Sequence, residues 1–393
     1  MDIKSIFSRL RKLALREVEI SRRRPLYLFC MLIAPVFFSF MFVDVMEEGA
    51  PNEIPAAVVD DDDSQVSRTL LRTLDAMQET NLTVKYKNFS DAKDALRKGE
   101  VFAIVHVPHG LSEKALTQRT PTIYFYTNDA YFLAGSFLFK NMKVLGELSG
   151  LAITKATLSA KGLDEDRIMG LIQPITVESH PLNNPSLNYS IYLTNIFIPA
   201  ILLLIVFIAT CYSIGLEWKR GTQKKWFKES GENVVIALTG KLLPQTAVYM
   251  LMFAFMDVYL YKINGFPIAC SLLRLLGIQL LVTLASQAFS VAIFGILAGQ
   301  MRLAMSVASL LGVLSISLCG FTFPVMAMPK IMEAISWLLP LRHYYLIYVN
   351  QVLDGYSIIY AWKSFAVLVA ILGLPLLFIK VYEKAFNEVN YQA

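Results

Sequence analysis

The sequence is short of charge and of cysteine. Asp, Glu, Lys and Arg make up 17% of its 393 residues, whereas a soluble globular chain carries about 25%. No CxxC pair occurs, and all the cysteines lie in apolar runs, at Cys30, Cys211, Cys270 and Cys319. These absences argue against a disulfide framework and a cysteine-rich metal site, and they favour a membrane protein.

Motifs for catalysis and nucleotide binding are also missing. The chain has no GxxxxGK[ST], no HExxH, no GxSxG and no GxGxxG after a strand, and its four histidines are scattered. We therefore predict no catalytic residue, no metal site and no cofactor in this chain. Any hydrolysis of ATP with Mg²⁺ is expected on a separate subunit. The uneven charge indicates membrane orientation and predicts no nucleic-acid partner.

What the sequence has instead is long apolar runs. A helix that crosses the hydrocarbon core needs about 20 apolar residues. The first run spans residues 25–43, and a second region, 187–382, holds five more. Those five are predicted at Leu187–Leu216, Ala237–Tyr261, Leu272–Ala298, Leu303–Phe323 and Trp362–Tyr382. The fold class predicted is a polytopic α-helical membrane protein with six spans.

A basic amphipathic helix is predicted at residues 1–24. Its apolar face includes Ile6, Phe7, Leu10 and Leu13, and basic residues lie between them, which suits a helix in the headgroup plane. Residues 1–24 hold eight Lys/Arg against three Asp/Glu. With six spans, the positive-inside rule then places both termini in the cytoplasm, including a cytoplasmic tail at 383–393.

Residues 44–186 alternate strand and helix patterns and predict an α/β extracytoplasmic domain between the first two spans. The acidic run at residues 60–64 is interpreted as a helix cap, with Ca²⁺ binding as the alternative. Strands are expected at Ile54–Val59, Leu82–Tyr86, Val101–Val107, Thr122–Tyr126 and Ile175–Glu178. Helices are expected at Ser64–Met77, Asp91–Lys98 and Tyr131–Ala160.

Two further segments depart from simple spans. Residues 325–349 are apolar but interrupted, and with Pro324, Pro329 and Pro340 they predict a re-entrant hairpin on the outer side. Residues 217–236 form a basic segment after the second span, holding five Lys/Arg between Glu217 and Lys228. Such a polar segment suits docking on a soluble motor, although a solvated positive-inside loop has the same composition.

Charges inside the spans are costly and often functional. Lys241 lies near the cytoplasmic end of the third span, where its ammonium can reach the interface. Asp257 lies near the outer end, where Lys262 or Arg274 could pair with it. Interface anchoring is the simpler interpretation of both residues, and contact with a substrate or a proton is the alternative.

Three stretches give the chain a specific resemblance. They are IPAAVVDDDDSQVSRTLLRTLDA from Ile54, EWKRGT from Glu217, and GFTFPVMAMP from Gly320 with LPLRHYYLIYVNQVLDG from Leu339. With the order of elements, they resemble the ABC-2 (type V) exporter permeases, in particular the bacterial drug-efflux-like branch with a large periplasmic domain. Trp218 and Lys219 depart from the more acidic start usual in the coupling segment.

The resemblance implies a dimer of permease subunits, of one chain or of two related chains, with a cytoplasmic ABC ATPase. The branch also commonly uses a periplasmic adaptor and an outer-membrane channel. Coupling to the ATPase would fall to the amphipathic helix, in contact with membrane lipid, and to the segment containing Glu217, Arg220, Gly221 and Thr222.

Export of a hydrophobic or amphipathic substrate from the cytoplasm or inner leaflet is the function predicted. The surfaces that bind it would come from the second and fifth spans, near Phe197, Phe207, Ser309 and Phe321. The alternative is a membrane-anchored receptor or scaffold whose external domain binds a ligand or envelope protein. A membrane enzyme finds no support, because the spans lack clustered His, Cys or carboxylate residues.

Overall fold

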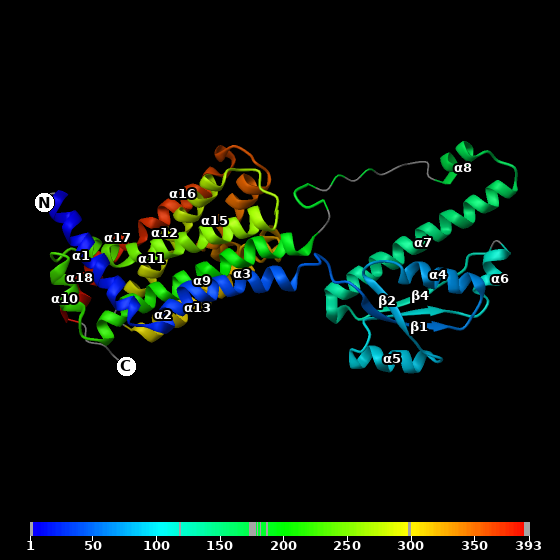
Figure 1. The fold of residues 1–393 in the computed structure, drawn as a ribbon, viewed down its shortest axis with the longest axis horizontal. Helices are drawn as coiled ribbons and strands as arrows, with labels where there is room; N and C mark the ends of the chain where they lie inside the picture. Colours follow the sequence, from blue (N-terminus) through cyan, green and yellow to red (C-terminus); the bar gives the residue numbers. More distant parts are fainter. Residues whose placement is uncertain are drawn as a thin grey trace. The chain divides into compact units, whose positions relative to one another are not determined.

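The computed structural model describes residues 3–117, 119–172, 178, 180, 182–185, 188–297 and 300–388 (Figure 1). The chain divides into two compact units. The membrane unit comprises Met1–Glu47 and Pro181–Ala393, and the inserted unit comprises Glu48–His180. Each unit has its own hydrophobic core, so each is described by itself.

The inserted unit is built on a four-stranded sheet in the order β2-β1-β3-β4. The central strand β1 pairs in parallel with β2 and β3, and β4 closes the sheet antiparallel to β3. The strands are β1 Ile54–Asp60, β2 Thr80–Lys85, β3 Ala103–Val107 and β4 Tyr124–Thr127. The strand predicted at Ile175–Glu178 falls on residues of which 175–177 lie outside the described part of the chain.

Helices cover both faces of this sheet, which explains why β1 and β3 are apolar along nearly their whole length. Alternate residues of the strands pack against α5 on one face and against α4 and α7 on the other. The helices are α4 Gln65–Asp75, α5 Phe89–Lys98, α6 Leu111–Leu116, α7 Phe132–Ala160 and α8 Glu165–Ile172. Ser64 caps α4 through its hydroxyl, which accepts from Ser67 N–H at 3.0 Å.

Five helices of the described chain are long and apolar enough to cross a membrane. Four are α9 Tyr189–Lys219, α11 Val234–Asp257 extended by η3 Val258–Ile263, α12 Leu272–Ile296 and α13 Met301–Leu318. The fifth runs over Ile358–Glu388 as η6 Ile358–Ala361, α16 Trp362–Leu372, α17 Leu374–Leu377 and α18 Ile379–Glu388. Helix therefore continues past residue 382, where the sequence predicts a tail.

The segment before the inserted unit is also helical. Helix α1, Ile3–Arg22, is followed by α2 Pro25–Leu28, η1 Phe29–Ile33 and α3 Ala34–Val45. The π-helical turn η1 lies just before Pro35, the second residue of α3. Proline has no N–H to donate, and here it falls where the hydrogen-bond pattern changes from π-helix to α-helix, so no regular helical hydrogen bond is lost. The apolar part, Phe29–Val45, is shorter than the five candidate spans and is not one of them, although the sequence predicts a first span at residues 25–43.

Three prolines organise the segment between α13 and the last span. Pro324 precedes the 3₁₀ turn η4 Val325–Ala327, and Pro329 precedes α14 Lys330–Ser336. Pro340 is the first residue of α15 Pro340–Tyr348, which continues as η5 Val349–Leu353. Each proline stands at the start of an element, where its fixed φ fits and no intrahelical N–H donor is needed. The segment thus consists of two short helices rather than one span.

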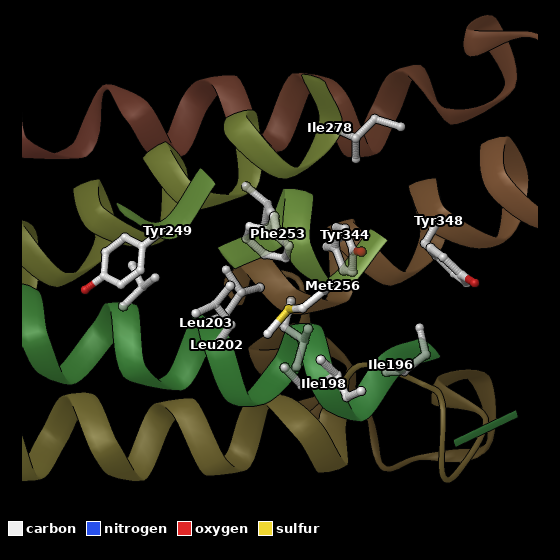
Figure 2. Close-up of a cluster of buried hydrophobic side chains, with 14 of the residues drawn as sticks. Ile196, Ile198, Leu202, Leu203, Tyr249, Phe253, Met256, Ile278, Tyr344 and Tyr348 are labelled. Atoms are coloured by element: carbon white, nitrogen blue, oxygen red, sulfur yellow. The ribbon is translucent and has the colours of Figure 1, made fainter. Parts of the chain in front are cut away.

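The core of the membrane unit is shared by α9, α11, α12 and α15. Figure 2 shows Leu202 and Leu203 of α9 beneath Tyr249 and Phe253 of α11, with Tyr344 of α15 alongside. These side chains are buried within the protein. A second apolar cluster lies where α1, α10 Gln223–Glu229 and α18 gather at one end of the unit (Figure 1). We call this the α10 end.

Candidate functional site

The link between α9 and α10 is a tight, glycine-dependent turn. Arg220 is the C-cap of α9, and Gly221 takes a φ of 67°, which residues with a side chain rarely adopt. Gly221 N–H donates to the Trp218 carbonyl at 3.0 Å, and Thr222 N–H donates to the Glu217 carbonyl at 2.9 Å. Thr222 then begins α10. The turn therefore places a short basic helix directly against the end of α9.

Glu217, in the last turn of α9, is the centre of a buried ion network. Its side chain is 2% exposed. One carboxylate oxygen accepts from Lys241 Nζ at 2.8 Å. The other accepts from Arg16 Nη2 at 2.7 Å and from Thr222 Oγ1 at 2.5 Å. Three donors on three further elements thus compensate for the removal of this carboxylate from water.

Lys241 extends the network to a second buried carboxylate. Its side chain is also 2% exposed. The Nζ donates to Glu17 Oε2 at 2.6 Å and lies 5.0 Å from the centre of the Trp226 ring. Gln245 donates to Glu17 at 3.3 Å and to the Ser213 hydroxyl at 2.8 Å. The two glutamates are balanced by Lys241 and Arg16, which leaves the buried group formally neutral.

An outer pair of contacts reaches α10. Glu229, in the last turn of α10, lies 3.7 Å from Arg16 and 3.5 Å from Lys12. The network therefore joins α1, α9, α10 and α11 through charged side chains. Removing one partner of a buried ion pair costs about 3–5 kcal/mol, so α1, α9 and α11 are held firmly together at the α10 end, whereas the Glu229 contacts with α10 are longer and partly exposed.

Helix α1 is fixed to the protein along one face. Leu13 is buried and packs against Gly240 of α11, while Ile6 and Leu10 pack against the same apolar cluster. A Cβ at Gly240 would lie 2.7 Å from Leu13 Cβ, so the glycine permits the close approach of α1 and α11. Phe7 points away and is 74% exposed. Of the predicted interfacial residues, Ile6, Leu10 and Leu13 therefore pack against the protein, and Phe7 lies on the exposed face of α1, here called its open face.

The predicted coupling residues occupy different surroundings. Glu217 and Thr222 belong to the buried network, whereas Arg220 and Gly221 are exposed on the turn. Sequence reasoning missed Arg16, Glu17 and Glu229 altogether. It also interpreted Lys241 as an interface anchor, which is wrong because the ammonium is enclosed between two carboxylates. Glu17 carried a usable signal, because it falls on the buried face of α1 one turn after Leu13.

Asp257 forms a smaller polar contact in the span made by α11 and η3. It is 3% exposed and accepts from Gln279 Nε2 of α12 at 2.8 Å. Within the described residues its second oxygen and the Gln279 amide oxygen have no hydrogen-bond partner. The suggested pairing with Lys262 or Arg274 is wrong, because both cations are exposed while the carboxyl is buried and bonded to Gln279.

The predicted substrate-path residues do not meet at one place in this chain. Phe197 packs edge-on against Phe321, with ring centroids 5.8 Å apart. Phe207 is buried against Phe289 of α12, and Ser309 is half-buried on α13. Phe321 also borders a cavity of about 100 Å³ lined by the start of α9 and by α15. Its polar lining includes Asn184, Tyr192, Asn195, Tyr345 and Tyr348.

Within the described ranges no group of three or more His, Cys, Asp or Glu residues is arranged to hold a metal ion. The acidic run of the inserted unit instead bonds to its own backbone and to nearby hydroxyls. Asp62, for example, accepts from the N–H groups of Gly110 at 2.9 Å and Ser112 at 3.2 Å.

Long apolar helices with charged groups paired inside them define a multi-pass helical membrane protein. A family model described as ABC-2 family transporter protein matches residues 25–379, and the chain belongs to that family. It is therefore a transmembrane permease component of an ABC transporter, and the family implies an ABC ATPase subunit as partner. None of the curated proteins matches the chain.

Proposed function

We propose that this chain is the permease subunit of an ATP-driven exporter and that its ATPase docks on α10. The observation that carries the proposal is the Glu217 network, which connects α10 to α1, α9 and α11 through Arg16, Lys241 and Glu229. A membrane anchor needs no such buried polar junction. A permease driven from outside the bilayer needs one, because displacement at α10 must reach the spans.

The orientation follows from the basic residues of the α10 end. Arg22, Arg23 and Arg24 precede the helical run over residues 25–45, and the basic segment after α9 lies on the same side of the bundle. The positive-inside rule places this end in the cytoplasm of a bacterial inner membrane, with both termini. Residues 25–45 then form a sixth span, and the inserted unit is periplasmic.

The complete exporter would contain a second permease subunit, identical or related, and two ATPase subunits that bind ATP and Mg²⁺. The open face of α1, with Phe7, Leu15 and Val18 exposed, is suited to lie among lipid headgroups. The inserted unit offers a periplasmic surface for an adaptor protein that leads to an outer-membrane channel.

The cargo would be hydrophobic or amphipathic and would leave from the cytoplasm or the inner leaflet. The cavity beside Phe321 combines aromatic walls with asparagine and tyrosine side chains, which suits a molecule with both apolar and polar parts. Phe197 adjoins this cavity through its contact with Phe321, and half-buried Ser309 could face a second permease subunit, whereas buried Phe207 packs inside the chain against Phe289.

The docking proposal is tested with the purified permease, its ATPase and a fluorescent amphiphile in proteoliposomes. Arg220→Glu reverses an exposed charge on the turn before α10 and should weaken both ATPase binding and dye transport. Lys330→Glu makes the same change on exposed α14, at the far end of the bundle, and should leave both unchanged.

Glu217→Gln tests transmission rather than docking. It removes the charge shared by Lys241 and Arg16 and should leave ATPase binding intact while lowering the dye moved per ATP hydrolysed. Transport and binding that stay at the wild-type level in both Arg220→Glu and Glu217→Gln would refute the coupling assignment. A protein that binds a ligand through the inserted unit but moves no dye would favour a receptor.

A further inference from the structure

The last helix, α18, packs into the α10 end although the family match stops at its first residue, Ile379. Its sequence is polar on one side, and Lys384 is exposed. Tyr382, Ala385 and Phe386 are buried at helical spacing on the other side. One face of α18 is therefore buried in the protein, although the family model does not extend beyond the first residue of this helix.

Phe386 fills a space made by the rings of α9 and α10. It is 0% exposed. Its ring stacks on Phe227 of α10 with centroids 4.6 Å apart and planes 9° apart. It meets Trp226 edge-on at 5.0 Å and lies 5.1 Å from Trp218 of α9. The Trp218 indole N–H donates to the Ala385 carbonyl at 3.3 Å, which fixes α18 along this face.

One turn earlier, α18 packs against α12 and is hydrogen-bonded to it. The Tyr382 hydroxyl donates to the Val291 carbonyl at 2.7 Å in a fully buried contact. A Cβ at Gly295 would lie 3.1 Å from the Tyr382 ring and 3.0 Å from Phe378 Cβ, so glycine is what lets α12 come this close. Phe386 and Tyr382 therefore bind one short helix to α10 on one side and to α12 on the other.

We infer that α18 is a second transmission element, which positions α10 through Phe386 and carries its displacement to α12 through Tyr382. This rests on the proposed role of α10 as the docking helix. The ion network connects α10 with α1, α9 and α11. Helix α12 packs against α9 and α11, which themselves contact α10, and its contact with α18 adds a further connection to α10 that does not pass through the ion network.

The test uses the full chain with its ATPase in proteoliposomes. Spin labels at exposed Lys225 of α10 and exposed Ile296 of α12 report their separation, in a background with the native cysteines replaced. In the wild type the distance distribution should stay narrow in the nucleotide-free and vanadate-trapped states. In Phe386→Ala the trapped state should shift or broaden, and dye moved per ATP should fall about 5-fold or more, the lower range of allosteric coupling factors.

Tyr382→Phe keeps the ring and removes only the hydrogen bond to Val291, so it tests the same claim if Phe386→Ala folds poorly. Lys384→Ala changes an exposed residue of α18 and should behave as wild type. Phe386→Leu keeps an apolar side chain and should recover part of the coupling. If Phe386→Ala and Tyr382→Phe both kept wild-type distances and coupling while Glu217→Gln was uncoupled, the role of α18 would be overturned and the docking proposal would stand. Failure of the ATPase to bind the wild type would overturn the docking proposal instead.

Discussion

Lys241 is held between two buried carboxylates, and each of the three groups depends on the others. Without the ammonium, Glu17 keeps only the Gln245 amide as a donor, and Glu217 keeps Arg16 and Thr222. We expect Lys241→Met to lower the free energy of unfolding by about 3–5 kcal/mol, because a buried charge loses its partner. Thermal unfolding of the full chain in detergent measures this.

The double variant Glu17→Gln/Lys241→Met supplies the control. It removes one anion with one cation and leaves the Arg16–Glu217 pair in place, so most of the loss should be recovered. If the double variant were as unstable as the sum of its single variants, the three groups would not act as one network.

Asp257 differs from Lys241 because its contact is with an amide. Asp257→Ala leaves the Gln279 amide without its acceptor and should cost about 1–3 kcal/mol. Asp257→Asn keeps an oxygen for Gln279 Nε2 and adds N–H donors beside the free Gln279 oxygen, so it should be at least as stable as wild type. Unfolding in detergent ranks the two variants. Equal losses would show that the charge of Asp257 is essential to the contact.

At the residue scale the sequence revealed which positions are unusual but not what they contact. Lys241 and Asp257 stood out as charges within apolar runs, whereas Arg16 and Glu17 resembled other members of a basic helix. Their meeting depends on folding, since Glu17 and Lys241 lie 224 positions apart. Single-sequence reasoning gives the cost of burying a charge, but the partner comes only from the packing of α1 on α11.

Among the elements, α1 and α11 approach each other closely at the α10 end. Gly240→Ala would place a methyl group 2.7 Å from Leu13 Cβ and force α1 away from α11. Overpacking of this kind costs about 1–3 kcal/mol. We expect lower stability and faster hydrogen exchange in α1. Gly277→Ala is the matched control, because a Cβ at that position of α12 would meet nothing within 4 Å. Slow exchange in α1 of Gly240→Ala would contradict this packing.

In the inserted unit, Asp62 ties the loop after β1 to the start of α6. Hydrogen bonds from the Ser64 hydroxyl, and then from Ser112 and Gly110, lower the pKa of Asp62. A folded-state pKa below the unfolded value of about 3.9 stabilises the fold above that value, and the stabilisation is lost as the pH falls through the folded-state pKa.

Asp62→Asn should therefore lower the stability of the inserted unit at neutral pH. It should also reduce the loss of protection from hydrogen exchange that the wild type shows below about pH 4. Hydrogen exchange of residues 110–116 in the full chain measures both effects. Glu113→Gln, on the exposed side of α6, should keep the wild-type profile. The same pH profile in Asp62→Asn and wild type would show that this carboxylate does not stabilise the loop.

The element boundaries show where sequence patterns succeed. Apolar length located five of the six predicted spans as helices long enough to cross a membrane, and Pro329 and Pro340 marked the starts of α14 and α15 because proline suits the beginning of a helix. The pattern gave no sign that helix continues to Glu388. The polar side of α18 resembles a solvated tail. The burial of Phe386 could not be predicted, because it depends on contacts with the rings of Trp218, Trp226 and Phe227, which are distant in sequence.

For the whole molecule, composition and hydropathy led to a membrane protein, and the family match to an ABC-2 transporter protein supports that conclusion. The cargo did not follow from the sequence, because aromatic and aliphatic walls fit many apolar molecules. Of the residues proposed for the path, Phe197 and Phe321 are in contact, whereas Phe207 is buried against Phe289 and Ser309 lies on α13.

The orientation of the chain in the membrane is the claim on which the exporter proposal depends. In a chain with the native cysteines replaced, single cysteines at Lys93 of the inserted unit and Lys225 of α10 both lie at exposed positions. A membrane-impermeant maleimide is added to cells with a permeabilised outer membrane. We predict that Lys93→Cys is labelled at once and Lys225→Cys only after the inner membrane is disrupted. Labelling of Lys225→Cys with protection of Lys93→Cys would contradict the account.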